Sequence, residues 1–308
     1  MVAFLANWQR FFPPSLKDQT IINIYLPGWL ARTTFLKEQL AQYQSLHAKT
    51  MVRLHPVRPA DLERLAGRWR AGRANGDILF APCRLAQQWA REGLLAEWQG
   101  FFDMQFTPDS FLPGFLAGGQ AAGKQYLIPL LGHPLLVAAR QGAPAYPGLR
   151  ASASQVAVDP AGYPAPLEQA VALAWSRPPA QTHAWCRQQA ARRGLPYLLT
   201  PYPGEAAARL GGRVTWSVPA PGQPTVALAE GLVIPKTNRH YAASVAISRQ
   251  YLVAPGLWKK ADWSQQGVPV LELYYRSLGP KHPGPLLGDL RRALPPPAPP
   301  AAPPAGTR

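Results

Sequence analysis

The sequence predicts an α/β fold with doubly wound sheets, and the pattern of the first half of the chain carries that prediction. Short apolar runs alternate there with segments of helical periodicity, and most of these segments end at proline or glycine. A repeated strand–helix order is typical of a parallel sheet with helices on both faces. Ligands of such sheets bind beside the carboxyl ends of the strands.

Three apolar runs are predicted to be strands of this sheet. They cover residues 20–26 (TIINIYL), 51–57 (MVRLHPV) and 77–81 (DILFA), in which β-branched and aliphatic residues are frequent. A short turn containing proline follows each run. We therefore expect the ligand edge of the sheet to include the turns at residues 27–29, 56–59 and 82–84.

Three further segments have the apolar spacing of helices. Residues 35–46 repeat apolar side chains every three or four positions, and residues 60–72 begin after Pro59 and end on glycine. Residues 85–92 form the third segment, which Gly93 closes. Each helix follows a predicted strand, as the crossover connections of a parallel sheet require.

The second half of the chain has a weaker pattern. Pro129 lies inside its first predicted strand, and favours a crossover or edge strand because proline cannot donate to a sheet. Residues 295–308 are almost all proline and alanine, which predicts an extended, disordered tail. Strands are predicted at residues 126–131, 155–158, 213–218 and 225–234, and helices at 167–175, 182–193 and 241–252.

Basic residues outnumber acidic ones two to one in this chain of 308 residues. The 32 Lys and Arg against 16 Asp and Glu give a formal net charge of +16. Such an excess favours an anionic partner, which is nucleic acid, anionic lipid headgroups or an acidic protein. Because the basic residues are dispersed, a merely solvated surface is the alternative. The sequence has no helix-turn-helix, RNP or zinc-finger pattern, so it does not indicate nucleic acid as the partner.

The sequence also lacks the common catalytic and metal-binding motifs. G-x-S-x-G, H-E-x-x-H and the P-loop are absent, and Cys83 and Cys186 do not have the spacing of metal ligands. We therefore expect a protein that is not an enzyme and that holds no cofactor or metal. The two cysteines form either one disulfide or two free thiols.

The expected N-terminal extension, residues 1–19, is not typical of a secretory signal. It lacks a basic start, and Asn7, Gln9 and Arg10 interrupt its apolar stretch. The alternatives are an amphipathic segment that rests on a membrane or a partner, and a terminal helix packed on its own domain. No apolar run reaches the roughly 18 residues that a membrane span needs.

Short motifs in these strands and turns occur in an order that is known from one protein family. They cover residues 23–29 (NIYLPGW), 76–80 (GDILF), 89–97 (WAREGLLAE), 111–113 (FLP), 123–129 (GKQYLIP), 214–219 (VTWSVP), 231–236 (GLVIPK) and 267–269 (GVP). In this order, over residues 20–135 and 212–270, the chain resembles the extracellular solute-binding proteins of ABC importers. The resemblance is to their sugar-binding, maltodextrin-like group.

The resemblance implies a type II periplasmic-binding-protein-like fold, in which two lobes close over a ligand and crossing strands join them. Residues 126–131 and 225–231 are the expected crossing strands. The chain is shorter than the family pattern between residues 140 and 213, which implies a reduced second lobe. We expect lobe 1 at residues 20–137 and 227–262, and lobe 2 at 138–226 and 263–294.

The same resemblance suggests which residues face the ligand. Trp29 follows the first strand, where it either stacks on a ligand or packs in the core. Trp216 alternates with two valines, which favours core packing over a ligand contact. Pro82 and Cys83 belong to the turn after the third strand. The remaining candidates carry charge or titrate, and they are Arg84, His133 and Glu230.

Arg84 and His133 stand where the family often has acids, which would favour an anionic ligand. Glu230 either accepts a hydrogen bond from a ligand hydroxyl, pairs with Arg84, or faces solvent. The resemblance implies an extracytoplasmic, membrane-associated substrate-binding component of an ABC importer, which captures a sugar or small anion and meets permease subunits. The alternative is a repurposed fold that acts as an accessory or scaffold subunit of a larger complex.

Overall fold

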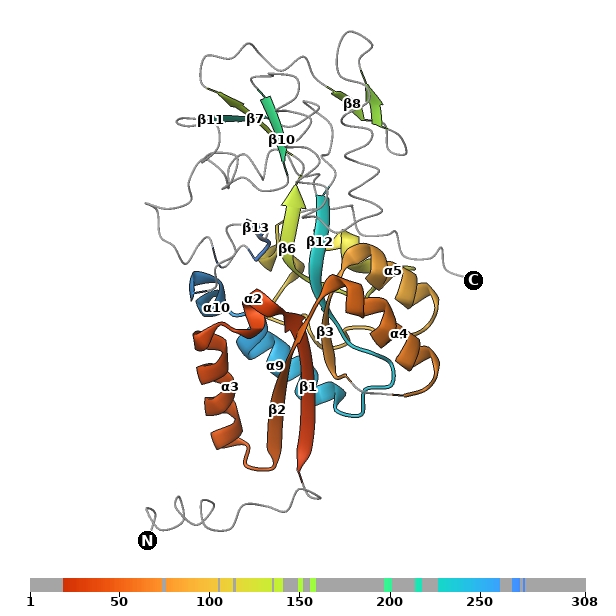
Figure 1. Cartoon of the computed structure of the whole chain (residues 1–308), viewed down its shortest axis with the longest axis vertical. Helices are drawn as coiled ribbons and strands as arrows, with labels where there is room; N and C mark the ends of the chain where they lie inside the picture. Colours follow the sequence, from red (N-terminus) through yellow and green to blue (C-terminus); the bar gives the residue numbers. More distant parts are fainter. Residues whose placement is uncertain are drawn as a thin grey trace, which may run out of the picture.

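The structure is a computed structural model of the chain, and its main body is a six-stranded sheet with helices packed along it (Figure 1). Several predicted segments lie outside the described residues. They are the helices at 167–175 and 182–193, the tail at 295–308 and nearly all of the N-terminal extension. The structure describes residues 19–73, 76–104, 106–112, 115–134, 136–140, 149–151, 156–158, 197–200, 214–217, 227–260, 268–271 and 274.

The order of strands in the main sheet is β13-β6-β12-β3-β1-β2. The three strands that the first half of the sequence predicts are present and parallel, with β1 between β2 and β3. Their bounds are Thr20–Pro27 for β1, Thr50–Val57 for β2 and Ile78–Pro82 for β3. The other three strands come from later in the chain, and are β6 (Ile128–Pro134), β12 (Ala227–Val233) and β13 (Val268–Pro269).

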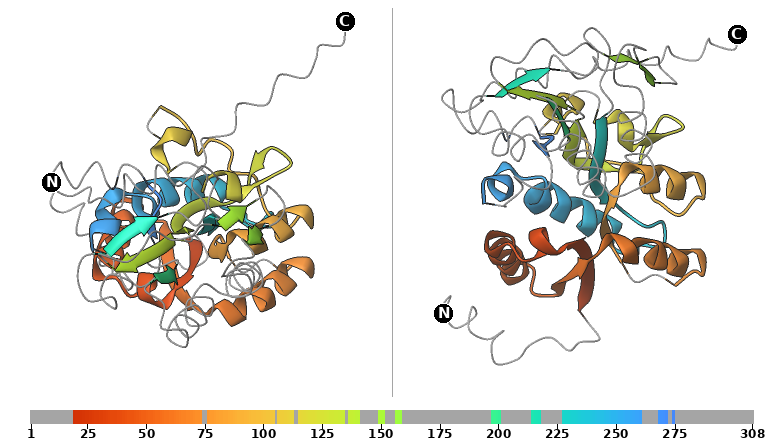
Figure 2. Two further views of the ribbon diagram at one scale, coloured as in Figure 1. Left: turned by 90° about the horizontal axis from the view of Figure 1, so that it is seen from above. Right: turned by 45° about the horizontal axis from the view of Figure 1, so that its top comes forward.

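Helices lie on two sides of this sheet, as a doubly wound fold requires. Figures 1 and 2 show α4 and α5 together on one side, and α3, α9 and α10 on the other. The rings of Trp69 and Trp89 join α4 to α5 edge to face, 5.4 Å apart. The helices are α2 (Gly28–Ala31), α3 (Thr34–Leu46), η2 (Pro59–Asp61), α4 (Leu62–Arg70), α5 (Cys83–Arg91), α9 (Tyr241–Ile247), the π-helical η5 (Ser248–Leu252) and α10 (Pro255–Lys260).

One apolar core runs between the sheet and both groups of helices. The inward residues of β1 are completely buried, and so are the large rings of Trp89 and Trp258. Burial of side chains this large supplies most of the free energy that opposes chain entropy. The core therefore fixes the main sheet as a rigid platform for whatever lies at its edges.

The predicted parallel sheet is in fact mixed. Strand β12 runs antiparallel to both β3 and β6, because it brings the chain back to the main sheet after residues 135–226. Pro129 suggested a crossover or an edge strand, and the edge alternative is wrong because β6 lies between β12 and β13. Pro129 is opposite Gly231 next to a register shift, and such a bulge tolerates a residue without an N–H. A Cβ on Gly231 would lie 2.0 Å from the carbonyl oxygen of Ile128, so this position needs glycine.

A second, smaller sheet follows β6 directly, because only residue 135 separates β6 from β7. Its order is β10-β7-β11, and all pairs are antiparallel. The division into lobes remains a prediction, although β13, which we expected in lobe 2, pairs with β6 of the main sheet. The remaining bounds are η3 (Pro108–Ser110), η4 (Ala117–Gly119), β4 (Gln120–Ala121), β5 (Lys124–Gln125), β7 (Leu136–Arg140), β8 (Leu149–Ala151), β9 (Val156–Val158), β10 (Tyr197–Thr200) and β11 (Val214–Ser217).

Candidate ligand-binding site

The carboxyl ends of β1, β3 and β6 meet at one edge of the main sheet. Strands β1 and β3 are parallel, and β6 runs in their direction because β12 is antiparallel to both of its neighbours. In Figure 1 this edge faces the smaller sheet. Of the predicted ligand residues, Trp29, Arg84 and His133 lie at or just after these strand ends. The topology thus gathers residues that are far apart in the sequence.

A histidine–carboxylate pair lies near the centre of this edge. Glu230 on β12 is opposite both Pro82 and Leu131, while His133 on β6 is opposite Leu228. The side chains of Glu230 and His133 therefore occupy the same face in diagonal positions, and His133 Nε2 lies 3.3 Å from Glu230 Oε2. The His133 side chain is only 1% exposed, whereas that of Glu230 is 20% exposed. Glu230 is the member of the pair that solvent or a ligand can reach.

Cys83 is the first residue of α5, directly beside this pair. Burial raises the pKa of its thiol above the ordinary value, and the carboxylate of Glu230 acts in the same direction. Backbone hydrogen bonds from Ala229 and Arg84 partly oppose this rise in pKa. Cys83 is a free, buried thiol, and Cys186 lies outside the described residues. We therefore assign Cys83 a packing role at this edge, where it stays protonated at neutral pH.

Arg84 is the exposed cation of this edge. It occupies the first turn of α5, next to the half-buried Pro82 that ends β3. None of the described carboxylates forms an ion pair with Arg84, since Glu230 is paired with His133. Its guanidinium is thus available for a carboxylate, a phosphate or a sugar hydroxyl.

The two tryptophans have different positions. Trp29 is half-buried in α2, immediately after β1, and its ring lies 6.3 Å from that of Trp258 at an angle of 60°. It packs against the core on that side, and no described contact joins it to His133 or Glu230. Trp216 lies on β11 of the smaller sheet, opposite Ala138 of β7, and its side chain is outside the described part of the chain.

Arg32 is a residue of this edge that the sequence analysis missed. It is exposed at the end of α2, and its Nη2 lies 3.8 Å from the point where a Cβ of Gly28 would stand. The guanidinium is therefore folded back over the turn that ends β1. The sequence could have indicated Arg32, because it follows the Pro27-Gly28 end of the first strand by one helical turn. Residues at that position lie close to the carboxyl end of the strand.

Two classes of site are not found in the described part of the chain. Its His, Cys, Asp and Glu residues nowhere gather in a group of three or more that could hold a metal ion. Of the helices in the described ranges, none has the length and apolar character needed to cross a membrane.

No protein-family model matches the sequence, and no curated protein matches it either. Solved structures do match. The GacH receptor of Streptomyces glaucescens, solved unliganded and with acarbose, aligns with a TM-score of 0.58 at 12% identity, over 90% of this chain and 87% of that one. The chain has the type II periplasmic-binding-protein fold. A Staphylococcus aureus extracellular solute-binding protein in complex with maltose aligns over 90% of this chain and 86% of its own, with a TM-score of 0.57 and 15% identity.

The periplasmic-binding-protein fold confirms the predicted fold class. At these identities the likeness establishes the fold alone, and the residues of the site have to be judged on their own chemistry. In that fold two lobes joined by crossing strands form the ligand site, and here β6 and β12 are the strands that lead out of the main sheet.

Proposed function

We propose that this chain captures a small solute, a sugar or a small anion, at the edge where β1, β3 and β6 end. The observation that supports this most is the gathering of Arg84, Glu230 and Trp29 at the carboxyl ends of neighbouring strands in a periplasmic-binding-protein fold. One similar structure is a receptor in complex with acarbose and another is an extracellular solute-binding protein in complex with maltose, which agrees with binding and not with catalysis.

The proposed site offers three kinds of contact to a small polar ligand. Glu230 accepts hydrogen bonds from hydroxyl groups, and its Oε2 lies 3.3 Å from His133 Nε2. Arg84 and Arg32 supply charge-assisted donors, which favour a carboxylate or phosphate on the ligand. The exposed side of Trp29 supplies an apolar face for a sugar ring. Closure of a second lobe on the bound ligand would then stabilise the closed state.

The proposed role is the substrate-binding component of an ABC-type importer, located outside the cytoplasm and associated with membrane permease subunits. The support is the fold, together with its likeness to an extracellular solute-binding protein of Staphylococcus aureus. No catalytic step, metal or cofactor belongs to this proposal, because capture needs only differential affinity for the closed state.

A second candidate function is that of an accessory or scaffold subunit which has kept the fold and lost transport. The observation that favours it is charge. The chain carries a net charge of +16, and several of its exposed arginines have no described carboxylate partner. Unpaired surface cations of this kind suit a protein that docks on an acidic surface.

A thermal-shift screen separates the two candidates. The purified chain is heated with maltose, acarbose, sugar acids and small inorganic anions in turn. Capture predicts a saturable rise in Tm with at least one class of ligand, because a ligand that binds only the folded state stabilises it. If Tm does not move with any member of the panel at millimolar concentration, ligand capture is wrong and the scaffold function gains support.

Two substitutions then test the site once a ligand is found. Glu230→Gln keeps the shape of the side chain and removes its charge, and we expect roughly tenfold weaker binding in isothermal titration calorimetry. Trp29→Ala is expected to weaken binding of a sugar more than that of an inorganic anion, because only a sugar ring stacks. Leu46→Ala is the control, since Leu46 is 72% exposed at the end of α3 that lies away from the site.

A further inference from the structure

A basic surface lies on one face of the neighbouring strands β1 and β2. We call it the arginine face, and it consists of Asn23 and Tyr25 on β1, Arg53 and His55 on β2, and Arg64 and Arg68 on α4. These residues come from three elements, and contacts among Asn23, Tyr25 and His55 hold the three strand residues in one arrangement.

The strand residues of the arginine face interlock. In the parallel register Asn23 is opposite Arg53 and Tyr25 is opposite His55, which places all four on the same side of the sheet. The rings of Tyr25 and His55 stack with centroids 4.7 Å apart and an interplanar angle of 19°. His55 Nε2 lies 2.9 Å from Asn23 Oδ1. The surface is therefore preorganised and not a set of independent flexible side chains.

Helix α4 completes the face from one side. Burial raises the pKa of the Tyr25 hydroxyl, and the guanidinium of Arg68 and, more weakly, that of Arg64 oppose this rise. Arg64 and Arg68 stand four residues apart on α4, so they lie on the same face of this helix. The Tyr25 ring also covers Gly76, where a Cβ would be 3.1 Å from the ring carbon Cε2. The arginine face thus combines the stacked rings of Tyr25 and His55 with Arg53 on β2 and two arginines on α4.

The position of this face in the fold is unusual because it is only partly covered. In doubly wound sheets both faces of the strands are normally buried by helices. Here Ile22, Ile24 and Leu26 on one face of β1 are fully buried, whereas Asn23 and Tyr25 on the other are half-exposed. Helix α4 packs toward α5 through Trp69 and Trp89, and Arg53 on the outermost strand β2 is exposed.

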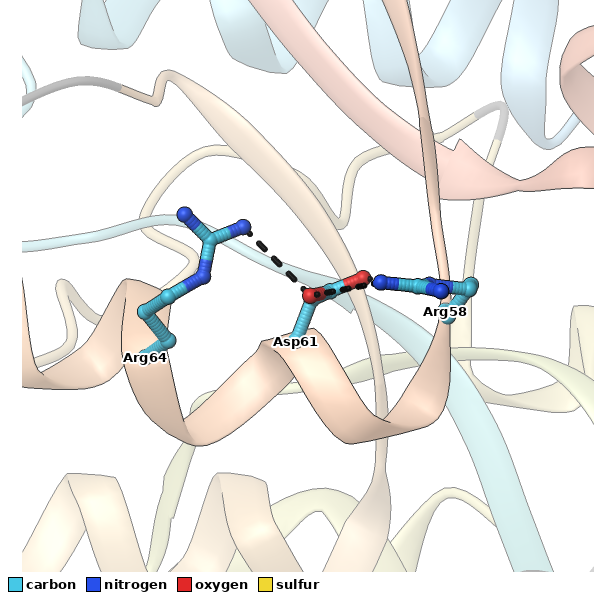
Figure 3. Close-up of polar contacts among 3 residues, drawn as sticks. All are labelled: Arg58, Asp61 and Arg64. Atoms are coloured by element: carbon cyan, nitrogen blue, oxygen red, sulfur yellow. Dashed lines mark hydrogen bonds and ion pairs between the residues drawn. The ribbon is translucent and has the colours of Figure 1, made fainter.

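The arginine face has an excess of positive charge that the described residues do not neutralise. Arg53 and Arg68 form no ion pair with a described carboxylate. Arg64 lies 3.4 Å from Asp61, but Asp61 is also held by Arg58 at 2.9 Å, so one carboxylate serves two guanidiniums (Figure 3). The nearby carboxylate of Asp77 is buried and accepts a hydrogen bond from the backbone N–H of Asn23.

We propose that the arginine face docks an acidic segment of a partner protein, with its carboxylates paired to Arg53, Arg64 and Arg68. Guanidinium groups bind carboxylates through two parallel hydrogen bonds, which gives the docked segment both affinity and register. The docking surface goes beyond the proposed solute capture, because none of its residues belongs to the proposed ligand site.

Two other anionic partners fit less well. Single-stranded nucleic acid needs aromatic faces on which bases stack, but the rings of Tyr25 and His55 already stack on each other. A membrane surface needs apolar side chains that insert beside the cations. The large hydrophobic residues that are exposed within the described ranges, Leu46 and Met104, do not belong to the arginine face.

The test compares two double charge reversals that change the net charge equally. Arg53→Glu with Arg68→Glu alters the arginine face, while Lys37→Glu with Arg91→Glu alters exposed cations on α3 and α5. A fluorescently labelled oligoglutamate peptide is titrated with each protein, and binding is followed by anisotropy at low and at physiological ionic strength. We expect the first variant to bind at least tenfold more weakly than the wild type, and the second to lose less than threefold at low salt.

Several results would overturn the proposal. Equal loss in both variants would show that net charge alone attracts the peptide. Absence of binding to the wild type at low salt would show that the face does not take carboxylates. Tighter binding of oligothymidine or of phosphatidylserine vesicles than of the peptide, lost in the first variant, would assign the face to another partner. If the charge reversal does not fold, Arg53→Gln with Arg68→Gln replaces it, with an expected loss of about fivefold.

Discussion

The two faces of strand β1 differ more than those of its neighbours, although they belong to the same eight residues. One face carries Ile22, Ile24 and Leu26, each with no exposed surface. The other carries Asn23 and Tyr25, which are half-exposed and take part in hydrogen bonds and ring stacking. The first face holds the sheet to α3 and its neighbours, and the second presents polar groups and nearby cations to solvent.

One face of β1 therefore serves the stability of the fold, and the other is available for binding. An apolar side chain contributes free energy of folding in proportion to the surface that it buries, whatever its partner. A polar side chain at a half-exposed position contributes little to folding, because water competes for its hydrogen bonds. The buried face should therefore respond to substitution through stability, and the open face through binding.

The largest expected effect comes from the buried face. Ile24→Ala removes a fully buried side chain and leaves a cavity, so we expect the free energy of unfolding to fall by about 3 kcal/mol. Urea denaturation followed by circular dichroism measures the change. Ile21→Ala is the matched control on the half-exposed face of the same strand, with an expected loss of about 1 kcal/mol or less. Equal losses at both positions would remove the distinction between the two faces.

A smaller, pH-dependent effect is expected at Asp77, which lies beneath the open face. Burial raises the pKa of its carboxyl above the ordinary value, although the backbone N–H of Asn23 and the charge of His240 oppose the rise. Because the folded state holds the proton more tightly, stability is lost as pH rises from the ordinary carboxyl pKa through the folded one. Asp77→Asn should therefore be more stable than the wild type at neutral pH and lose this advantage near pH 3.

Denaturation curves at several pH values check the sign of this effect. Asp109→Asn is the matched control, because it makes the same chemical change at an exposed position. If the difference in stability between Asp77→Asn and the wild type is constant from pH 3 to pH 7, burial does not raise the pKa of this carboxyl.

The smallest change in stability is expected on the open face itself. Arg64→Ala removes an ion pair at 3.4 Å whose side chains are 62% and 21% exposed, and Arg58 still holds Asp61. Solvent-exposed pairs of this kind stabilise proteins very little. We expect a denaturation midpoint within error of the wild type, together with weaker binding of the oligoglutamate peptide. A clear loss of stability would make Arg64 part of the fold and not of a docking surface.

The sequence predicted the first half of the main sheet well, for a local reason. Strands β1 and β3 are apolar runs that end at prolines, and β2 has a proline as its last residue but one, so their bounds can be recognised without knowledge of their partners. The start of α5 was expected at Leu85 and is at Cys83, because Pro82 directly precedes the helix and its extended backbone leads into the first turn. Signals of this kind lie within a few residues of the element that they define.

The rest depended on pairings between distant segments. The antiparallel direction of β12 follows from its partners β3 and β6, and nothing in the sequence of β12 alone reports it. The His133–Glu230 pair requires the register of two strands nearly a hundred residues apart, so the sequence left Glu230 with three alternatives. The predicted role of the site residues in binding a ligand remains a prediction for the experiments above.

The reactivity of the buried Cys83 thiol can be used to measure how often this edge of the sheet opens. Because the pKa of the thiol is raised and its surface is covered beside Ala229 of β12, a thiol reagent reacts with it only when this edge of the sheet opens. In a chain with Cys186→Ser, the rate of modification would time those openings without any attached probe. Slower modification in the presence of a solute would identify the solutes that hold β3 and β12 together.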